Sequence, residues 1–184
     1  MPVQTPICDF GKKALPFELK STDNKIISLD DIKGENGTLI MFICNHCPYV
    51  KAITKEIVED CNELKKIGIN SVAICSNDFI NYPEDSFDNM IKFSKDNQFS
   101  FPYLQDKTQE IAKAYDAVCT PDFFGYDKDL GLQYRGRLRE LKNFVPAKDG
   151  VSDLLKAMKQ IAETGKGPQD QIPSAGCGIK WKYD

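Results

Sequence analysis

A short apolar run that leads directly into two cysteines and a proline is the feature of this sequence that most limits its fold. Residues 38–43 read TLIMFI, with no alternation of polar positions, which is typical of a strand buried on both faces of a sheet. Residues 44–48 follow at once and read CNHCP. Proline suits the first position of a helix, and apolar residues then recur at spacings of three and four. The sequence therefore predicts a buried strand, a cysteine-bearing junction and an amphipathic helix from Pro48 to near Gly68.

The residues after this helix repeat the pattern and indicate the fold class. Residues 69–75 (INSVAIC) form a second apolar run, and a helical pattern at 84–96 follows an acidic, turn-rich stretch. A strand, helix, strand, helix unit places its two strands parallel in one sheet. The sequence therefore predicts an α/β protein.

Hairpins and short helices account for the rest of the chain. Residues 17–29 alternate around a polar turn, and residues 123–126 and 131–137 read as two late strands of a second hairpin. Helices are expected at 108–115 and 151–163, before a Gly/Pro-rich tail at 165–184. We find no internal repeat and no linker, so one domain over residues 1–184 is predicted.

Composition and cysteine count narrow the functional classes. The 184 residues carry a net charge of -3 and are 41% hydrophobic, which gives enough material for a core and no basic footprint for nucleic acid or anionic membrane. Seven cysteines, an odd number, favour free thiols in a reducing compartment with a reactive subset. The first ten residues lack the basic start and apolar stretch that are typical of a leader peptide, and no run of about 18 apolar residues occurs. We therefore expect a soluble, cytoplasmic protein.

Cys47 is the strongest candidate for chemistry. If Pro48 opens the helix, Cys47 is its N-cap, where unpaired amides and the helix dipole favour a thiolate. His46, the only histidine, is adjacent, and a protonated imidazole directed at the sulfur would lower the thiol pKa further. A buried structural role is the usual one for an isolated cysteine, but the helix start, the histidine and a second cysteine at Cys44 favour a reactive thiol.

The other candidate residues leave alternatives open. Cys44 and Cys47 have the C-x-x-C spacing of thiol–disulfide exchange or of half a zinc site. The zinc interpretation is weaker, because the remaining ligands would have to come from distant Cys119 and Cys177. Cys44 follows an apolar strand, so an inert buried thiol competes with a resolving role. Arg135 and Arg137 could hold a thiolate or an acidic substrate, but solvated arginines on a strand are the favoured interpretation. The three remaining cysteines are expected to be incidental: Cys8, Cys61 and Cys75.

Four segments together resemble a known group of proteins: FELKSTDNKIISL at 17–29, TLIMFICNHCPYVK at 38–51, FPYLQDKTQEIAKAYDAVCTPDFFGYDKDLGLQYRGRL at 101–138 and GCGIKW at 176–181. They resemble the redoxin-like branch of the thioredoxin superfamily, the alkyl hydroperoxide reductase/thiol-specific antioxidant group, and in particular bacterial thioredoxin-family proteins with an N-H-C-P-[YF]-V motif. The resemblance implies a thioredoxin-like fold, with a central mixed β-sheet flanked by helices, an N-terminal hairpin extension and a C-terminal tail. It also implies that Cys47 is the attacking cysteine and that Thr120-Pro121 is the cis-proline turn, which would bring Cys119, Thr120 and Pro121 near Cys47.

The sequence departs from both family patterns at the second reactive position. In the thioredoxin register the motif is Cys47-Pro48-Tyr49-Val50, so valine occupies the place of the resolving cysteine. In the peroxiredoxin register Cys44 takes the place of a threonine that helps to bind peroxide. Cys47 is the attacking residue in either register.

These observations lead to one leading hypothesis and two rivals. The leading hypothesis is a cytoplasmic thiol–disulfide oxidoreductase and antioxidant redoxin that needs no cofactor or metal, in which Cys47 attacks a disulfide or a peroxide. The resolving candidates, in order, are Cys44, Cys119, Cys177 and an external thiol such as glutathione or thioredoxin. The rivals are a peroxiredoxin-like peroxidase and a non-catalytic binding or metal-binding module. Whether the tail brings Cys177 to the site is left open by the sequence.

Overall fold

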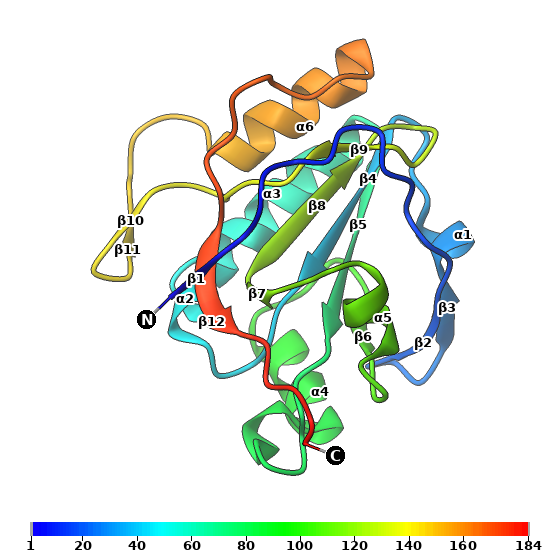
Figure 1. Ribbon diagram of the computed structural model, residues 1–184, viewed down its shortest axis with the longest axis vertical. Helices are drawn as coiled ribbons and strands as arrows, with labels where there is room; N and C mark the ends of the chain where they lie inside the picture. Colours follow the sequence, from blue (N-terminus) through cyan, green and yellow to red (C-terminus); the bar gives the residue numbers. More distant parts are fainter. Residues whose placement is uncertain (1, 184) are drawn as a thin grey trace.

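A seven-stranded mixed sheet forms the centre of the molecule (Figure 1). The computed structural model describes residues 2–183. The strands of this sheet, in spatial order, are β3 (Ile26–Ser28), β2 (Glu18–Ser21), β6 (Tyr103–Gln105), β5 (Ile69–Cys75), β4 (Gly37–Phe42), β8 (Asp122–Tyr126) and β9 (Leu132–Tyr134). β4, β5 and β6 are parallel to one another, and the other neighbouring strands pair antiparallel. Both predicted hairpins and the predicted parallel pair are confirmed.

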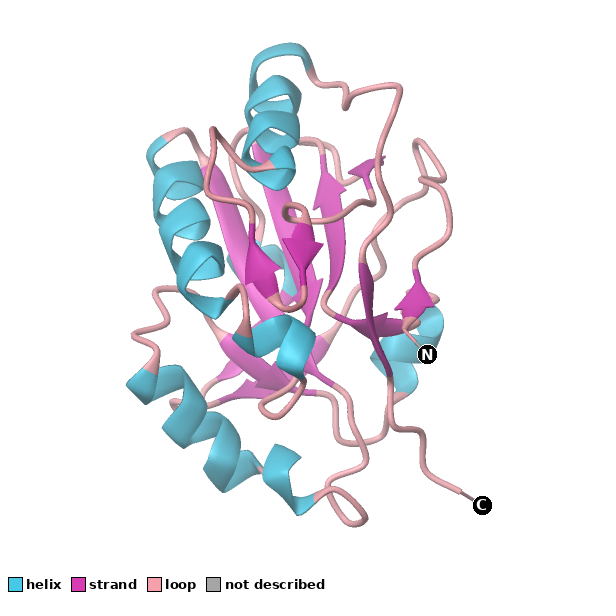
Figure 2. Ribbon diagram, turned by 90° about the vertical axis from the view of Figure 1, so that its left-hand side faces the viewer, coloured by secondary structure: helices cyan, strands magenta, loops and turns pink. Residues whose placement is uncertain are grey.

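The two faces of the sheet carry separate cores, and β4 contributes to both. Leu39 and Met41 pack on the face covered by three helices, α3 (Thr54–Lys66), α4 (Phe87–Asp96) and α6 (Asp153–Thr164). Ile40 and Phe42 pack on the opposite face with α1 (Leu29–Ile32) and α5 (Glu110–Ala114). Figure 2 shows α3, α4 and α6 lined up along one side of the sheet. Because side chains alternate between faces along a strand, an unbroken apolar run is what a strand between two cores requires.

The helix predicted from Pro48 to near Gly68 is broken, which corrects the sequence interpretation. Its first turn is α2 (Pro48–Lys51), and α3 begins only at Thr54. The carbonyl of Val50 accepts hydrogen bonds from the Ile53 amide at 3.0 Å and from the Thr54 hydroxyl at 2.7 Å. A threonine side chain that takes a carbonyl in this way competes with the helical amide bond, and the chain bends there.

Two further predicted elements are shorter than the sequence pattern suggested. The helix expected from residue 84 begins at Phe87, because Ser86 has an extended backbone and its side chain caps the helix by accepting from the Asn89 amide at 3.2 Å. Residues 83–85 form a separate 3-10 turn, η1 (Pro83–Asp85). The late strand expected to reach residue 137 ends at Tyr134.

The C-terminal tail folds back and builds a second, three-stranded sheet. β12 (Ala175–Gly178) lies between β1 (Val3–Gln4) and β7 (Cys119–Thr120) and pairs antiparallel with both. Figure 1 shows β12, in red, running down beside β7 at the end of the molecule where β4 and β5 terminate. A two-stranded ribbon, β10 (Leu141–Lys142) and β11 (Val145–Pro146), projects nearby. Within residues 2–183 no helix combines the length and the hydrophobicity that crossing a bilayer requires.

Candidate active site

Cys47 lies between the end of β4 at Phe42 and the start of α2, and Pro48 occupies the first helical position. The predicted strand-to-helix junction and N-cap position are therefore confirmed. The residue is fully buried, and its sulfur lies 3.3 Å from the carbonyl oxygen of Thr120. The sheet and the β7 segment thus hold this sulfur from two sides, although 73 positions separate Cys47 from Thr120.

The Thr120-Pro121 peptide bond is cis, as the sequence resemblance implied. The hydroxyl of Thr120 lies 3.4 Å from the Cys44 sulfur, and the carbonyl of Pro121 accepts from the Ser174 hydroxyl at 2.8 Å. One short turn therefore contacts both cysteines of the C-x-x-C spacing and the C-terminal tail.

The pKa of the Cys47 thiol is lowered to about 4, and the largest cause is a hydrogen bond from the Cys44 thiol. Hydrogen bonds from Cys177 and Thr120 lower it further, while burial works in the opposite direction. The same contact raises the pKa of Cys44 well above its ordinary value, assisted by burial and by the nearby Asp85 carboxylate. The proton shared by the pair therefore resides on Cys44, and Cys47 carries the negative charge.

The cause of this lowered pKa differs from the one that the sequence suggested. Cys47 makes no side-chain capping bond in the four-residue helix α2, and the Val50 amide is the smallest of the named contributions. Thiol donors from Cys44 and Cys177, rather than a helix terminus, stabilise the thiolate.

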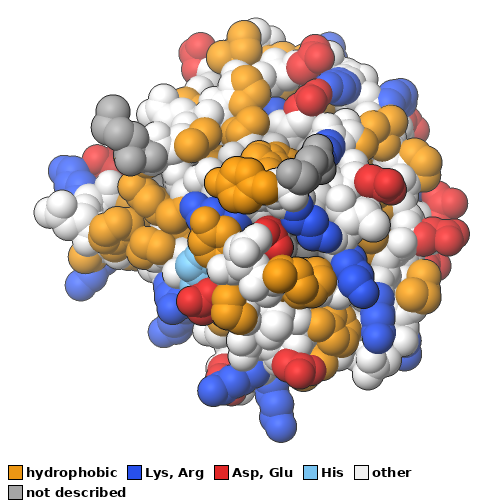
Figure 3. Space-filling view, turned by 60° about the horizontal axis from the view of Figure 1, so that its bottom comes forward, with side chains coloured by type: hydrophobic (Ala, Val, Ile, Leu, Met, Phe, Trp, Pro, Cys, Tyr) orange, Lys and Arg blue, Asp and Glu red, His pale blue; other side chains and the backbone are white. Residues whose placement is uncertain are grey.

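His46 faces Asp85 rather than the sulfur of Cys47. Its Nδ1 lies 2.7 Å from Oδ2 of Asp85, and its ring stacks on Tyr82 with 6.1 Å between ring centroids. The imidazole is 28% exposed, and it reaches the surface at this end of the molecule, among hydrophobic and charged side chains (Figure 3). The expectation that a protonated His46 lowers the pKa of Cys47 directly is wrong for this arrangement.

Asp85 is a residue of the site that the sequence interpretation missed. Its side chain is fully buried, and it accepts hydrogen bonds from the Asn45 amide at 2.8 Å and from the Asn77 side chain at 2.9 Å. Tyr103 donates to the Asn45 side chain at 2.8 Å. The acidic stretch at 84–88 was visible in the sequence, but its register against residue 45 depends on the tertiary fold.

Cys44, His46 and Asp85 bring one thiol, one imidazole and one carboxylate within 4.8 Å of one another. These are the ligand types that zinc takes, and they differ from the set considered from the sequence, which needed Cys119 and Cys177. Both oxygens of Asp85 accept hydrogen bonds, from residues 45 and 77, and three side chains are one ligand fewer than a closed tetrahedral zinc site needs. The trio is best described as part of a hydrogen-bonded network beneath Cys47.

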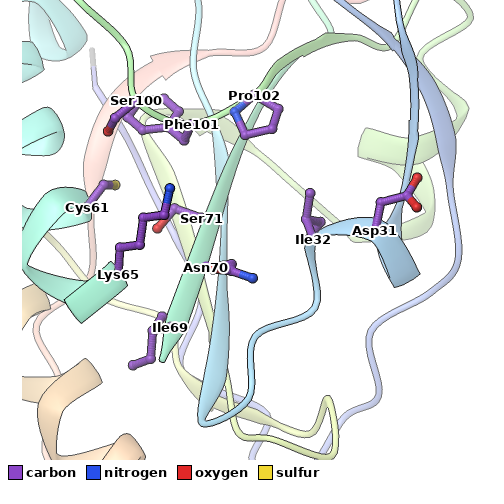
Figure 4. A pocket seen from close by; sticks show the side chains of 10 residues that line it. All are labelled: Asp31, Ile32, Cys61, Lys65, Ile69, Asn70, Ser71, Ser100, Phe101 and Pro102. Carbon is purple, nitrogen blue, oxygen red and sulfur yellow. The ribbon is translucent and has the colours of Figure 1, made fainter. Parts of the chain in front are cut away.

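Three other cysteines are buried and protonated. Burial raises the pKa of Cys61 and of Cys75 to about 12, in agreement with their prediction as core residues. The pKa of Cys119 is also raised by burial, and its thiol donates to the Pro121 carbonyl at 3.5 Å. Cys61 and Ser71 lie beside a cavity of about 200 Å³ near the amino end of β5, the end of the sheet remote from Cys47 (Figure 4).

Arg135 has a structural partner instead of a solvated position. It is 6% exposed, and its guanidinium donates to both carboxylate oxygens of Asp122, at 3.1 and 2.9 Å. Asp122 in turn accepts from the Val118 amide at 3.0 Å. The prediction of a solvated arginine is therefore wrong, and the side chain neutralises a buried acid that fixes the chain on both sides of the cis-proline. Arg137 is paired with Asp153 at 2.7 Å.

A cavity of about 210 Å³ borders the site on the side of Pro121. Tyr49, Pro121 and Ala175 line it, together with Arg137 and Arg139. The cavity is therefore large enough for part of a small molecule, and the two arginines in its wall are paired with Asp153 and Glu56.

Comparisons with known proteins agree with this geometry. The model of the AhpC/TSA family matches residues 10–138, a range that includes Cys44, Cys47 and the Thr120-Pro121 turn. A comparison with curated proteins gives no match.

Solved structures give the fold. An uncharacterized conserved protein from Geobacillus kaustophilus is 43% identical, with a TM-score of 0.94 and coverage of 100% of this chain and 98% of that one. A hypothetical protein from Sinorhizobium meliloti is 33% identical, with a TM-score of 0.90 and coverage of 98% of each chain. The thioredoxin domain of a thiol-disulfide oxidoreductase from Bacteroides vulgatus is 15% identical, with a TM-score of 0.58 and coverage of 73% of this chain and 89% of that one. The fold is thus thioredoxin-like, as the sequence resemblance implied.

Proposed function

The chain belongs to the AhpC/TSA family, and we propose that it is a thiol–disulfide oxidoreductase whose attacking nucleophile is Cys47. The observation that carries this proposal is the position of Cys47 at the N-cap of α2, 3.3 Å from the carbonyl of the cis Thr120-Pro121 turn that also contacts Cys44. Hydrogen-bond donors at Cys44 and Cys177 lower the pKa of the Cys47 thiol. Such donors stabilise an anion, and the thiolate is the form of cysteine that attacks disulfides. At neutral pH a thiol with a pKa of about 4 is almost wholly ionised.

In the first step the Cys47 thiolate attacks one sulfur of a disulfide. A new S–S bond joins Cys47 to that sulfur, the substrate S–S bond breaks, and its other half leaves as a thiolate. Cys44 acts as a positioning residue, because its proton stabilises the Cys47 anion before the attack. The Thr120-Pro121 turn holds Cys44 and Cys47 in register, and Pro48 starts the helix that follows.

A second thiol completes the reaction by attacking the sulfur of Cys47, and an external thiol reductant of the thioredoxin or glutathione type returns the protein to its reduced form. Free thiols of this kind suit a reducing compartment, so the proposal includes the cytoplasm as the site of action. No metal or organic cofactor is part of this reaction.

The proposal is tested by replacing the nucleophile. Cys47→Ser removes the thiolate but keeps the size of the side chain, so we expect the reduction of a small aromatic disulfide, dithiobis(nitrobenzoate), to slow by more than about 100-fold. The matched control is Cys8→Ser, which removes a half-buried thiol elsewhere in the chain and should leave the rate within about twofold of wild type. A Cys47→Ser protein that retains the wild-type rate would remove the proposal.

Peroxide reduction is the second candidate, and the burial of Cys47 is the observation that favours it. A fully buried sulfur is reached more easily by a small peroxide than by a large disulfide. Attack on the peroxide would break its O–O bond and leave Cys47 as a sulfenic acid, with release of an alcohol or water. Stopped-flow mixing with hydrogen peroxide decides between the two, because a rate no higher than that of free cysteine excludes a dedicated peroxidase.

A further inference from the structure

The C-terminal strand β12 pairs with β7, the strand whose Thr120 carbonyl faces the Cys47 sulfur. Cys177 of β12 pairs directly with Thr120 of β7, and Gly178 pairs with Cys119. The carbonyl of this same Thr120 lies 3.3 Å from the Cys47 sulfur. The backbone pairing alone therefore places Cys177 opposite the residue that touches the nucleophile.

Hydrogen bonds on both sides of Cys177 hold the strand in this register. Ser174 donates to the Pro121 carbonyl at 2.8 Å, and the Ile179 amide donates to the Val118 carbonyl at 3.2 Å. Gly176 packs against the turn so closely that a Cβ atom built there would lie 2.0 Å from the Thr120 carbonyl oxygen. Only glycine fits this position, so the sequence of the tail matches the surface on which it lies.

The side chain of Cys177 also belongs to the site. Cys177 is among the hydrogen-bonding groups that lower the pKa of Cys47, and it is partly exposed whereas Cys44 and Cys47 are buried. Cys177 is therefore the most accessible of these three thiols to a reductant from solution.

We infer that Cys177 is the resolving thiol and that β12 is a substrate strand built into the chain. This inference rests on the proposed function of Cys47. After Cys47 has formed a mixed disulfide, Cys177 loses its proton to the solvent and attacks the Cys47 sulfur. A Cys47–Cys177 bond forms, the bond from Cys47 to the substrate breaks, and the second half of the substrate leaves as a thiolate. One substrate disulfide is reduced to two thiols, and the two cysteines are oxidised to one disulfide.

The electrostatics of Cys177 favour this order of events. Its pKa is raised to about 11 by burial, by a hydrogen bond to Cys47 and by the charge of Cys47, and it is lowered by Lys180. Two of these three raising causes vanish once Cys47 is in a mixed disulfide. For Cys44, burial and the charge of Asp85 persist after that change.

The differences in exposure and in pKa between Cys177 and Cys47 also explain how the protein returns to its reduced state. A reductant that attacks the exposed Cys177 sulfur expels Cys47, the thiol of lower pKa, and thiols of lower pKa leave faster. A Cys44–Cys47 disulfide would instead present two buried sulfurs, at 1% and 0% exposure. One dithiol, or two monothiol molecules, supply the two electrons and end as a disulfide.

The test counts the thiols released from dithiobis(nitrobenzoate) and maps the products by mass spectrometry. Reduced wild-type protein, freed of reductant, should release about two equivalents of nitrothiobenzoate and contain a peptide that links Cys47 to Cys177. Cys177→Ser should stop after about one equivalent, with the aromatic thiol attached to Cys47. The control Cys8→Ser should behave as wild type. Cys44→Ser should react more slowly but still release about two equivalents and form the Cys47–Cys177 link. A Cys44–Cys47 link in wild type, or a wild-type protein that stops at the mixed disulfide, would overturn the inference.

Displacement of the strand gives an independent test that keeps all cysteines. Gly176→Val forces β12 away from Thr120, so we expect the second release to slow by more than about 10-fold while the first release persists. Gly178→Ala is the matched control, because its Cβ would meet only the Val3 side chain, at 3.5 Å, and both releases should keep their wild-type rates. An unchanged second release in Gly176→Val contradicts the inference. Absence of any adduct at Cys47 in all proteins contradicts the proposed function itself.

Discussion

Cys75 ends β5, Cys47 follows the end of the neighbouring parallel strand β4, and both residues are almost wholly buried. Burial and the nearby Asp85 raise the pKa of Cys75 to about 12, whereas the pKa of Cys47 falls to about 4. The difference lies in the donors around each sulfur. Hydrogen bonding by Cys44, Cys177 and Thr120 lowers the pKa of Cys47 by more than burial raises it. Reactivity at this end of the sheet is therefore set by neighbouring side chains and not by depth.

The change expected to break this contrast most strongly is Cys44→Ala. It removes the largest cause of the low Cys47 pKa, while the hydrogen bonds of Cys177 and Thr120 continue to oppose burial, so the pKa should rise to about 8. At pH 6 the thiolate fraction falls tenfold for each unit by which the pKa exceeds the pH, and we expect the rate of alkylation of Cys47 to drop by about 100-fold. The measurement is the rate of iodoacetamide labelling, with the labelled residue located by mass spectrometry.

Cys44→Ser is the control for that experiment. A serine hydroxyl can donate to the Cys47 sulfur from the same place, so the labelling rate should stay within about 10-fold of wild type. Equal rates for Cys44→Ala and wild type would show that Cys44 does not stabilise the thiolate.

A second prediction concerns the pH dependence of stability under reducing conditions. The pKa of Cys47 is about 4 in the folded chain and has an ordinary value of 9.0. Between these values the folded chain binds fewer protons than the unfolded chain, so the stability that Cys47 contributes is present near pH 9 and is lost as the pH falls toward 4. The free energy of unfolding of wild type, relative to Cys47→Ser, should therefore increase from pH 5 to pH 8, as measured by urea unfolding. A constant difference would contradict the low pKa.

Cys75→Ala tests the comparison between Cys47 and Cys75 by removing the unreactive cysteine. The substitution removes a buried sulfur from β5 and should lower the free energy of unfolding by about 1 to 2 kcal/mol. Labelling of Cys47 should remain at the wild-type rate, because Cys75 is not among the groups that set its pKa. A large loss of labelling would mean that the two strand ends are coupled.

The smallest effect is expected at His46. Its imidazole contacts Asp85, so His46→Asn should change the alkylation rate of Cys47 by less than about twofold. A 10-fold decrease would restore the direct role for the imidazole that its place in the sequence suggested.

The sequence was sufficient for elements that depend on local patterns. The apolar run at 38–43, the proline at 48 and the helical spacing after it predicted β4, the N-cap position of Cys47 and most of α3. The cis bond at Thr120-Pro121 was implied only by family resemblance, because no local pattern distinguishes it from a trans bond.

Contacts between distant segments were beyond local reasoning. Asp85 meets residue 45, Arg135 meets Asp122, and Cys177 meets Thr120 only after the sheet is formed. Because arginine is usually exposed, the sequence predicted a solvated Arg135. The prediction was wrong because the buried acid that pairs with Arg135 could not be identified from the sequence. The C-x-x-C spacing made Cys44 the first resolving candidate, but it could not show that Cys44 is also the main cause of the low Cys47 pKa.

The most direct test of the central claim is the pH profile of Cys47 alkylation in the reduced wild-type protein. Rates are measured with iodoacetamide between pH 3 and pH 9, and the modified cysteine is identified in each sample. We predict that Cys47 is labelled first and that its rate rises with a midpoint near 4. A midpoint near that of an ordinary thiol, about 8.5, would show that Cys47 is a buried cysteine like Cys75 and would contradict the account.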